Sequence, residues 1–459
     1  MKIATVVFGG GVSTLGIDII SRKLLDNDEL AGHIEVNNFT EEDPSAMDGA
    51  GILLVSLYWD DNLMDYFRFL KKYGVKPGKE GGPKVILGGI SAVNTSLLDG
   101  FFDYVVLGDG ECVIVDLVSA IVNGVKYEGP GVVGAGDYSD NEFCYAENIP
   151  AHAYVENRGN RTARIEIARG CRYRCAFCQL AYTKPYREQP IDVLTYLIQK
   201  APTKSVGLFA PDRSGYSALP ALEAVCKKYG KNNTAEDLRL DTVRRMDVVS
   251  KLKFGVEGFT EAKRREFHKV VSNKNLVLGM KHIFQTLKKP NGKRHTTATM
   301  YMIGDLPGEA PEEACEFWDV MEEADEYCNP PFTLFLTMNS FSPKPYTPLE
   351  LCGIHPYNKW GVFWDNKRRL KNITTASRGG MLGPSLRITR MICSRGDQRL
   401  TKLLFFLANE GRKIIKSPSK AAGEQVESLI RKQGIDPEFI WGELPSGTVL
   451  PHHRYRVPS

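Results

Sequence analysis

Short apolar runs alternate with helix-like stretches through the first quarter of the chain. Five runs rich in Val, Ile and Leu span residues 3–10, 33–39, 51–57, 84–89 and 103–109. Between them, segment 62–74 places apolar side chains at helical spacing: Leu63, Tyr66, Phe67 and Leu70. Strands alternating with helices are typical of a doubly wound parallel sheet, so we expect a Rossmann-like domain over residues 1–127.

Glycines stand where several of these predicted strands end, among them Gly9, Gly10, Gly88 and Gly89. In an open parallel sheet a ligand crevice lies beyond the carboxyl ends of the strands, and glycine there lets the backbone approach a bulky ligand. Glycine also serves plain turns. We therefore take Gly88 and Gly89 as candidate cofactor-binding residues, with simple turns as the alternative.

A second alternating region follows a stretch rich in Gly, Asn and Asp at residues 128–160, which we interpret as a linker. Six further strand candidates are separated by helical segments: 163–170, 204–212, 237–244, 251–258, 296–304 and 331–339. This pattern predicts a partial (β/α)6 TIM barrel over residues 161–350. Active sites of such barrels gather at the carboxyl ends of the strands.

Residues 351–459 are predicted to form a basic, mainly helical C-terminal domain. From Lys359 to the end the chain has 19 Lys and Arg against 8 Asp and Glu, although its overall charge is only +4. Segment 395–413 carries an apolar stripe: Leu400, Leu403, Leu404, Leu407 and Ala408. The charge suggests an anionic partner, with a merely solvated basic face as the alternative.

Basic side chains of the same region could follow a phosphate backbone, and aromatic side chains lie near them as stacking surfaces. They are Lys367, Arg368, Arg369, Lys371, Arg378, Arg387 and Arg390, with Trp360, Phe363 and Trp364. On this basis we hypothesise a nucleic acid or a nucleotide base as the substrate, while a peptide or a small metabolite stays open.

Three of the ten cysteines cluster in the stretch ARGCRYRCAFCQL, directly after the first predicted barrel strand: Cys171, Cys175 and Cys178. The other seven stand apart, and we expect them to be small buried hydrophobic residues. Neither an apolar leader nor a membrane span is evident, so we expect a cytoplasmic protein, in which clustered thiols bind metal more often than they pair.

The spacing of the three cysteines indicates which metal centre they hold. Structural zinc needs four protein ligands, and no second Cys pair or nearby His completes such a set. A 4Fe-4S cluster bound by three thiolates instead leaves one iron open to an external ligand. The spacing therefore favours an iron-sulfur cluster over zinc or simple packing.

The stretch GCRYRCAFC resembles the signature loop of the radical S-adenosylmethionine (SAM) enzymes, including the aromatic Phe177 before the third cysteine. The resemblance implies that the three cysteines bind three irons of a 4Fe-4S cluster and that the fourth iron chelates SAM. Reductive cleavage of SAM would then start radical chemistry on a carbon centre. It also implies an external electron donor such as flavodoxin or ferredoxin.

Further segments resemble radical SAM proteins that carry a cobalamin-binding-like domain before the barrel, and together they cover most of residues 1–410. They are VILGGISAV and FDYVVLGDGE in the front domain, and LFAPDRSGY, DLRLDTVR, FGVEGFTEAKRREF, MYMIGDLPGE, NSFSPKPYTPLE and SRGDQRL after them, in the order of the chain. By this resemblance four residues contact the amino-acid or ribose part of SAM: Asp212, Ser214, Arg239 and Glu257. Local strand-end salt bridges are the alternative. One extra residue, Asp305, departs from the family's usual IGLPGE.

Cobalamin is a possible cofactor of the front domain, held there without a histidine ligand. The motif that supplies an axial histidine is missing, and His33 is predicted to be a partly exposed strand residue. We expect a cobalamin-dependent radical SAM methyltransferase. The alternatives are a cobalamin-independent radical rearrangement or modification, including modification of a nucleobase, and a non-catalytic iron-sulfur protein. The sequence assigns no catalytic acid or base.

Overall fold

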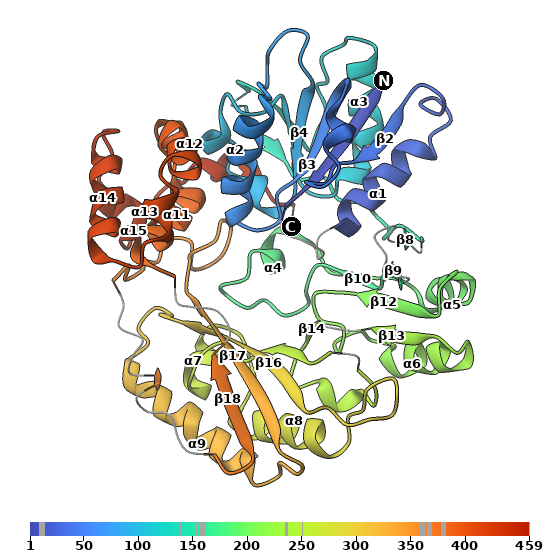
Figure 1. The fold of residues 1–459 in the computed structure, drawn as a ribbon, viewed down its shortest axis with the longest axis vertical. Coiled ribbons are helices and arrows are strands. Elements are labelled where there is room, and N and C mark those ends of the chain that lie inside the picture. Colours follow the sequence, from blue (N-terminus) through green and yellow to red (C-terminus); the bar gives the residue numbers. More distant parts are fainter. Residues whose placement is uncertain are drawn as a thin grey trace. The chain divides into compact units, whose positions relative to one another are not determined.

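The computed structural model describes residues 1–8, 14–137, 139–152, 154–155, 162–234, 237–249, 251–357, 363–364, 370–377 and 382–458. The chain divides into two compact units (Figure 1). We call residues 1–147, 342–356 and 383–459 the front unit, and residues 148–341 and 357–382 the barrel unit. Gly9 and Gly10, which we predicted to end the first strand, lie outside the described residues.

The front unit contains a six-stranded sheet in the order β2-β1-β3-β4-β5-β6. Its strands are β1 (Lys2–Val7), β2 (Glu35–Asn38), β3 (Ala50–Ser56), β4 (Lys84–Gly88), β5 (Tyr104–Val106) and β6 (Val132–Gly134). The first five are parallel, and β6 runs antiparallel to β5. This order places the topological switch point between β1 and β3, where open parallel sheets bind ligands.

Helices cover both faces of the front sheet, as the sequence predicts. They are α1 (Thr14–Leu25), α2 (Asp61–Tyr73) and α3 (Ile114–Val122). Leu63, Tyr66, Phe67 and Leu70 of α2 are all buried, so the predicted apolar face is the packed face. The helix ends at Gly74, which adopts the left-handed conformation (φ 64°) that favours glycine at this position.

Two stretches differ from the expected domain layout, which has a linker at 128–160 and a separate domain from residue 351. Within the predicted linker, β6 extends the front sheet, and β7 (Asn141–Glu142) pairs with β19 (Tyr455–Arg456) near the end of the chain. The terminal helices are α11 (Pro384–Arg395), α12 (Thr401–Asn409), α13 (Arg412–Lys416), α14 (Lys420–Arg431) and α15 (Pro437–Trp441). All belong to the front unit, where α12 packs its predicted stripe against α2.

A buried corner of the front unit joins the loop 342–356 to the end of the chain. Glu350 accepts hydrogen bonds from His452 (2.9 Å), from His453 (2.8 Å) and from the backbone N–H of Tyr346 (2.7 Å). Arg395 is fully buried and donates to four carbonyl oxygens, those of Glu350, Cys352, Ile440 and Gly442. These bonds hold the C-terminal segments in place.

The barrel unit is built from two sheets of mostly parallel strands. The first has the order β13-β12-β9-β8 and the second the order β14-β15-β16-β17-β18. The six predicted barrel strands appear as β9 (Thr162–Glu166), β12 (Ser205–Phe209), β14 (Asp237–Leu238), β15 (Lys253–Gly255), β16 (Thr297–Gly304) and β17 (Phe332–Ser340). The strands of this unit that we did not predict are β8 (Tyr154–Val155), β11 (Arg187–Glu188), β13 (Asn232–Thr234) and β18 (Ile373–Ser377).

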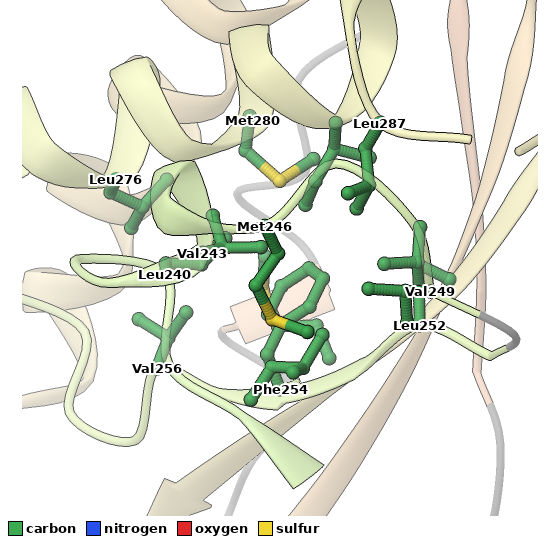
Figure 2. Close-up of a cluster of buried hydrophobic side chains, with 14 of the residues drawn as sticks. Leu240, Val243, Met246, Val249, Leu252, Phe254, Val256, Leu276, Met280 and Leu287 are labelled. Atoms are coloured by element: carbon green, nitrogen blue, oxygen red, sulfur yellow. The ribbon is translucent and has the colours of Figure 1, made fainter. Parts of the chain in front are cut away.

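The core of the barrel unit lies between the strands and their outer helices: α5 (Ile191–Lys200), α6 (Leu219–Lys228), α8 (Asn273–Gln285) and α9 (Ala314–Asp325). Alternate residues of β16, Ala298, Met300 and Met302, belong to this core. Figure 2 shows Met246 between Met280 and Phe254 at the centre of one part of it. This packing leaves the carboxyl ends of the strands to carry polar groups. In the described part of the chain, every helix falls short of the length and apolarity that crossing a membrane requires.

Candidate functional site

The three cysteines lie on one loop at the carboxyl end of the barrel strands. The loop follows β10 (Ala168–Arg169), which pairs with β11 (Arg187–Glu188), and it ends at α4 (Leu180–Thr183). Gly170 starts the loop in the left-handed conformation (φ 71°), and a Cβ atom there would lie 2.4 Å from the carbonyl oxygen of Pro185. Only glycine fits this turn, from which the loop with the three cysteines continues.

The three thiols are close enough to influence one another electrostatically. Burial, with a smaller contribution from the neighbouring Cys178 and Cys175, raises the pKa of Cys171 to about 11. Burial likewise raises the pKa of Cys175 and Cys178. Thiols of this kind stay protonated until a metal displaces the protons, so the set is suited to a metal centre and not to a free nucleophile.

Segments from two other parts of the barrel hold the cysteine loop. Arg172 donates to the carbonyl oxygen of Gly215 (3.0 Å), in the segment after β12. The backbone N–H of Ala176 donates to the carbonyl oxygen of Phe267 (2.9 Å), and the Cys175 thiol lies 3.7 Å from the carbonyl oxygen of His268. The loop is therefore fixed by tertiary contacts on both sides.

Arg239 stands beside the cysteine loop at the end of β14. Its guanidinium binds both oxygens of Asp241 (3.0 and 2.9 Å) and lies 3.8 Å from the centre of the Tyr173 ring. Burial works against its charge, but the bonds to Asp241 raise the pKa of Arg239. A cation fixed in this way interacts with the Cys175 thiol and partly opposes the rise that burial causes in the pKa of that thiol.

Asp212 and Ser214 follow β12 and are joined to the same network. The Ser214 hydroxyl donates to Asp212 Oδ1 (2.6 Å), and it accepts the backbone N–H of Arg239 (3.1 Å). The other oxygen, Asp212 Oδ2, is buried and has no hydrogen-bond partner among the described residues. A Cβ atom on Gly215 would lie 2.4 Å from that oxygen, so this glycine keeps the space beside it open. An unsatisfied buried carboxylate oxygen suits an external hydroxyl or ammonium donor.

Glu257 has an unusual backbone conformation for a non-glycine residue, with φ 69°. Its side chain folds over Gly255, where a Cβ atom would meet Glu257 Oε1 at 2.0 Å. The carboxylate lies 3.9 Å from the Lys269 ammonium, and both side chains are largely buried. Burial raises the pKa of Glu257, while Lys269 opposes that shift. Strained backbone of this kind gathers at functional sites.

Two other predicted positions can now be placed. Phe177 is half-buried within the cysteine loop. Asp305, the extra residue of MIGDLPGE, directly follows β16 and takes a left-handed conformation (φ 67°). The insertion is thus absorbed as a bulge at the carboxyl end of the strand, and Glu309 still accepts the backbone N–H of Leu306 (3.3 Å).

In the front unit the two candidate glycines have different surroundings. A Cβ atom on Gly89 would lie 2.4 Å from the carbonyl oxygen of Leu57, and its φ is 101°, so this glycine is explained by packing. A Cβ atom on Gly88 would meet nothing within 4 Å. Next to them, Tyr58 and Trp59 form an edge-to-face pair at 4.7 Å with Trp59 56% exposed. The space directly beside Gly88 is therefore open, and an exposed aromatic side chain lies near it.

The structure corrects part of the expected nucleic-acid surface. Phe363 is fully buried and packs against Trp318, and Arg387 is also buried. Arg390 binds both oxygens of Asp61 (3.0 and 2.6 Å). Phe363 and Arg387 serve the interior of the fold, and the partly exposed Arg390 is engaged by Asp61, so these three side chains do not offer the free contacts that we predicted. Several of the others lie outside the described residues.

Sequence reasoning missed Tyr173, Asp241 and Lys269, which complete the site. Tyr173 and Asp241 stand two residues from predicted site residues, Cys171 and Arg239, and that spacing could have found them. Lys269 comes from the loop between α7 (Glu261–Glu266) and α8, two residues after the segment FGVEGFTEAKRREF that we used.

The comparisons with known proteins agree with this arrangement at the level of the fold. The structure of the cobalamin-dependent SAM radical enzyme OxsB, with aqua-cobalamin and SAM bound, matches with a TM-score of 0.50 at 12% identity, over 94% of this chain and 75% of that chain. The chain has the fold of a cobalamin-dependent radical SAM enzyme. OxsB with aqua-cobalamin alone matches with a TM-score of 0.47 at 11% identity, over 94% of this chain and 75% of that one.

More distant matches to this fold were also found. SuiB of Streptococcus suis bound to SAM matches with a TM-score of 0.30 at 12% identity, over 48% of this chain and 50% of that one. No protein-family model matches the chain, and no curated protein matches its sequence.

Proposed function

We propose that the protein is a radical SAM enzyme. Cys171, Cys175 and Cys178 would each hold one iron of a 4Fe-4S cluster, and the open iron would bind SAM. When bound, these groups supply a 5′-deoxyadenosyl radical that abstracts hydrogen from a carbon centre. The observation that carries the proposal is three thiols on one fixed loop, each with a raised pKa and close enough to interact electrostatically.

The charges around the loop support a cationic occupant. Arg239 is neutralised by Asp241, and Lys269 is paired with Glu257. Neither of these two ion pairs supplies a cation for Asp212 or for the thiols once they are deprotonated. Iron ions, and the ammonium and sulfonium of SAM, would supply the missing positive charge.

The residues around the loop have distinct proposed roles in holding SAM. Asp212 Oδ2 would accept a hydrogen bond from the SAM amino group or a ribose hydroxyl, because it is buried without a partner among the described residues. Ser214 orients that carboxylate through its 2.6 Å bond. Arg239 and Glu257 would bind the remaining polar groups of SAM, each held in place by its own ion-pair partner.

We further propose that the reaction is cobalamin-dependent C-methylation, with cobalamin at the carboxyl edge of the front sheet. The open space at Gly88 and the exposed Tyr58 and Trp59 support this ligand. A cobalamin-independent radical modification is the second candidate, because packing against Leu57 fully explains Gly89. The substrate class is left to experiment, since the buried Arg387 and Phe363 remove part of the basis for a nucleic acid.

Product analysis tests these proposals. The anaerobically reconstituted protein, incubated with SAM and dithionite, is expected to form 5′-deoxyadenosine. A methyltransferase supplied with cobalamin and its substrate also forms S-adenosylhomocysteine. Cys315→Ser is a matched control, because Cys315 lies on α9, outside the cysteine loop, and should retain 5′-deoxyadenosine formation. Absence of 5′-deoxyadenosine from iron-loaded wild-type protein would contradict the proposal.

A further inference from the structure

The loop 267–271 between α7 and α8 clamps the cysteine loop and carries a buried cation to it. Phe267 and His268 accept the bonds from Ala176 and Cys175 described above, and His268 Nδ1 lies 3.2 Å from the carbonyl oxygen of Arg174. The next residue is Lys269, whose ammonium is largely buried and lies 3.9 Å from the Glu257 carboxylate. The contacts of Phe267 and His268 thus hold a buried positive charge next to the segment that carries two of the three proposed iron ligands.

A second buried arginine fixes the pairing between Lys269 and Glu257. Arg264 donates to the carbonyl oxygens of Gly258 (3.0 Å) and Phe259 (3.1 Å), just after Glu257. It also donates to the carbonyl oxygen of Val271 (2.7 Å), just after Lys269. The two backbone segments that carry the ion pair are therefore bridged by one rigid guanidinium, and the pair keeps its position relative to the cysteines.

The two cations at the site differ in how completely they are neutralised. Arg239 forms a bidentate bond to Asp241 at 3.0 and 2.9 Å. Lys269 and Glu257 are 3.9 Å apart, too far for a direct hydrogen bond. The charge of Lys269 is therefore the less completely neutralised of the two, and in a buried site it acts strongly on nearby charges.

We propose that the Glu257–Lys269 pair sets the reduction potential of the iron-sulfur cluster, with Lys269 favouring the reduced state and Glu257 limiting that effect. The inference rests on the proposed cluster at the three cysteines. Reduction adds one electron, which an external low-potential donor supplies, and no bond forms or breaks. Each added negative charge on the cluster is stabilised by a neighbouring cation and destabilised by a neighbouring anion, and nearby charge is one of the factors that set cluster potentials.

A redox titration of the reconstituted protein without SAM, followed by electron paramagnetic resonance, tests the proposal. Glu257→Gln keeps the shape of the side chain and removes its charge, so the ratio of reduced to oxidised cluster at a fixed potential should rise about tenfold, equivalent to about 59 mV for one electron. The double variant Glu257→Gln with Lys269→Met removes both charges and should return the ratio to near the wild-type value. Lys269→Arg keeps the charge and should leave the ratio unchanged.

Glu266→Gln is the matched control. Glu266 is the last residue of α7, the helix that lies between Glu257 and Lys269 in the chain. Its side chain is 53% exposed and pairs with Lys263 at 2.9 Å. It should leave the potential unchanged, because an exposed charge is screened by water.

The outcomes separate this inference from the proposed function. Wild-type protein that takes up no iron overturns both. A normal cluster whose potential is the same in Glu257→Gln as in the wild type overturns the inference alone. A rise that persists in the double variant also overturns it, because Lys269 would then not be its source. Iron content of each variant shows that the titrated cluster has formed.

Discussion

Two carboxylates in different parts of the molecule show how a structural acid differs from one prepared for a ligand. In the front unit, burial alone would raise the pKa of Glu350, but hydrogen bonds from His452 and His453 lower it to about 2. In the barrel unit, burial raises the pKa of Asp212, one of whose oxygens has no partner among the described residues. Hydrogen-bond donors of the protein itself satisfy both carboxylate oxygens of Glu350, whereas Asp212 Oδ2 has no hydrogen-bond donor among the described residues.

The Glu350 cluster resembles a metal site, but its hydrogen bonds make a metal unnecessary. The backbone N–H of Leu450 donates to His453 Nδ1 (3.2 Å), so the proton of that ring is on Nε2, which donates to Glu350. A ring nitrogen that carries a proton has no lone pair for a metal. Both oxygens of Glu350 are therefore satisfied, although His452 Nδ1 is buried without a hydrogen-bond partner among the described residues, and the bonds make this cluster a structural joint between residues about 100 positions apart.

The largest effect is expected at that joint. Glu350→Gln should lower the free energy of unfolding by about 3 kcal/mol at neutral pH, because the shift from the ordinary pKa of 4.5 to about 2 measures the lost charge interaction. Since the folded pKa lies below the unfolded one, this stability is present above pH 4.5 and is lost as the pH falls toward 2. Urea unfolding at pH 7 and at pH 3 checks this. A difference that does not shrink at pH 3 would contradict the structural role.

The two glycines of the front sheet differ in a similar way, because the protein's own packing explains Gly89 whereas Gly88 borders open space. The expected change in stability is smaller here. Gly89→Ala should destabilise the protein by about 2 kcal/mol, because its Cβ would meet the Leu57 carbonyl and its φ is positive. Gly88→Ala should change stability by less than about 0.5 kcal/mol and should instead reduce the amount of corrinoid retained after desalting. Thermal unfolding and the visible spectrum of retained corrinoid measure the two effects. Equal destabilisation by both variants would remove the contrast.

The smallest effect on folding is expected at Asp212. Asp212→Asn keeps an oxygen for the Ser214 hydroxyl, so the free energy of unfolding should stay within about 1 kcal/mol of the wild type. SAM binding should weaken at least about tenfold, because a charge-assisted bond to the ligand is lost. Equilibrium dialysis with iron-loaded protein measures this. Unchanged SAM affinity would place Asp212 with Glu350 as a purely structural acid.

Local patterns explain how much of the fold the sequence could predict. The strands β1, β3, β16 and β17 and the helix α2 were placed from apolar periodicity, because each is long enough for its pattern to be read. β18 was missed because its five residues, including Ile373 and the two threonines after it, lie in a region with an otherwise helical and basic composition.

The candidate site was predictable only where it follows from local spacing. The cysteine loop is a single segment, so its ligands could be recognised directly. Lys269 is held near the cysteine loop because the carbonyl oxygens of Phe267 and His268 accept hydrogen bonds from that loop. These contacts depend on how separate helices pack. The same holds for Glu350, whose partners His452 and His453 are about 100 residues away. Contacts of this kind follow from tertiary structure and leave no local signal.

The central claim is that three cysteine thiolates hold a cluster with one open iron. Its most direct test is the iron and acid-labile sulfide content of anaerobically reconstituted protein, compared with the variant in which Cys171, Cys175 and Cys178 are all replaced by alanine. The account predicts about four irons and four sulfides per wild-type chain and almost none in the variant. Zinc in place of iron in the wild type, or a full iron complement in the variant, would contradict it.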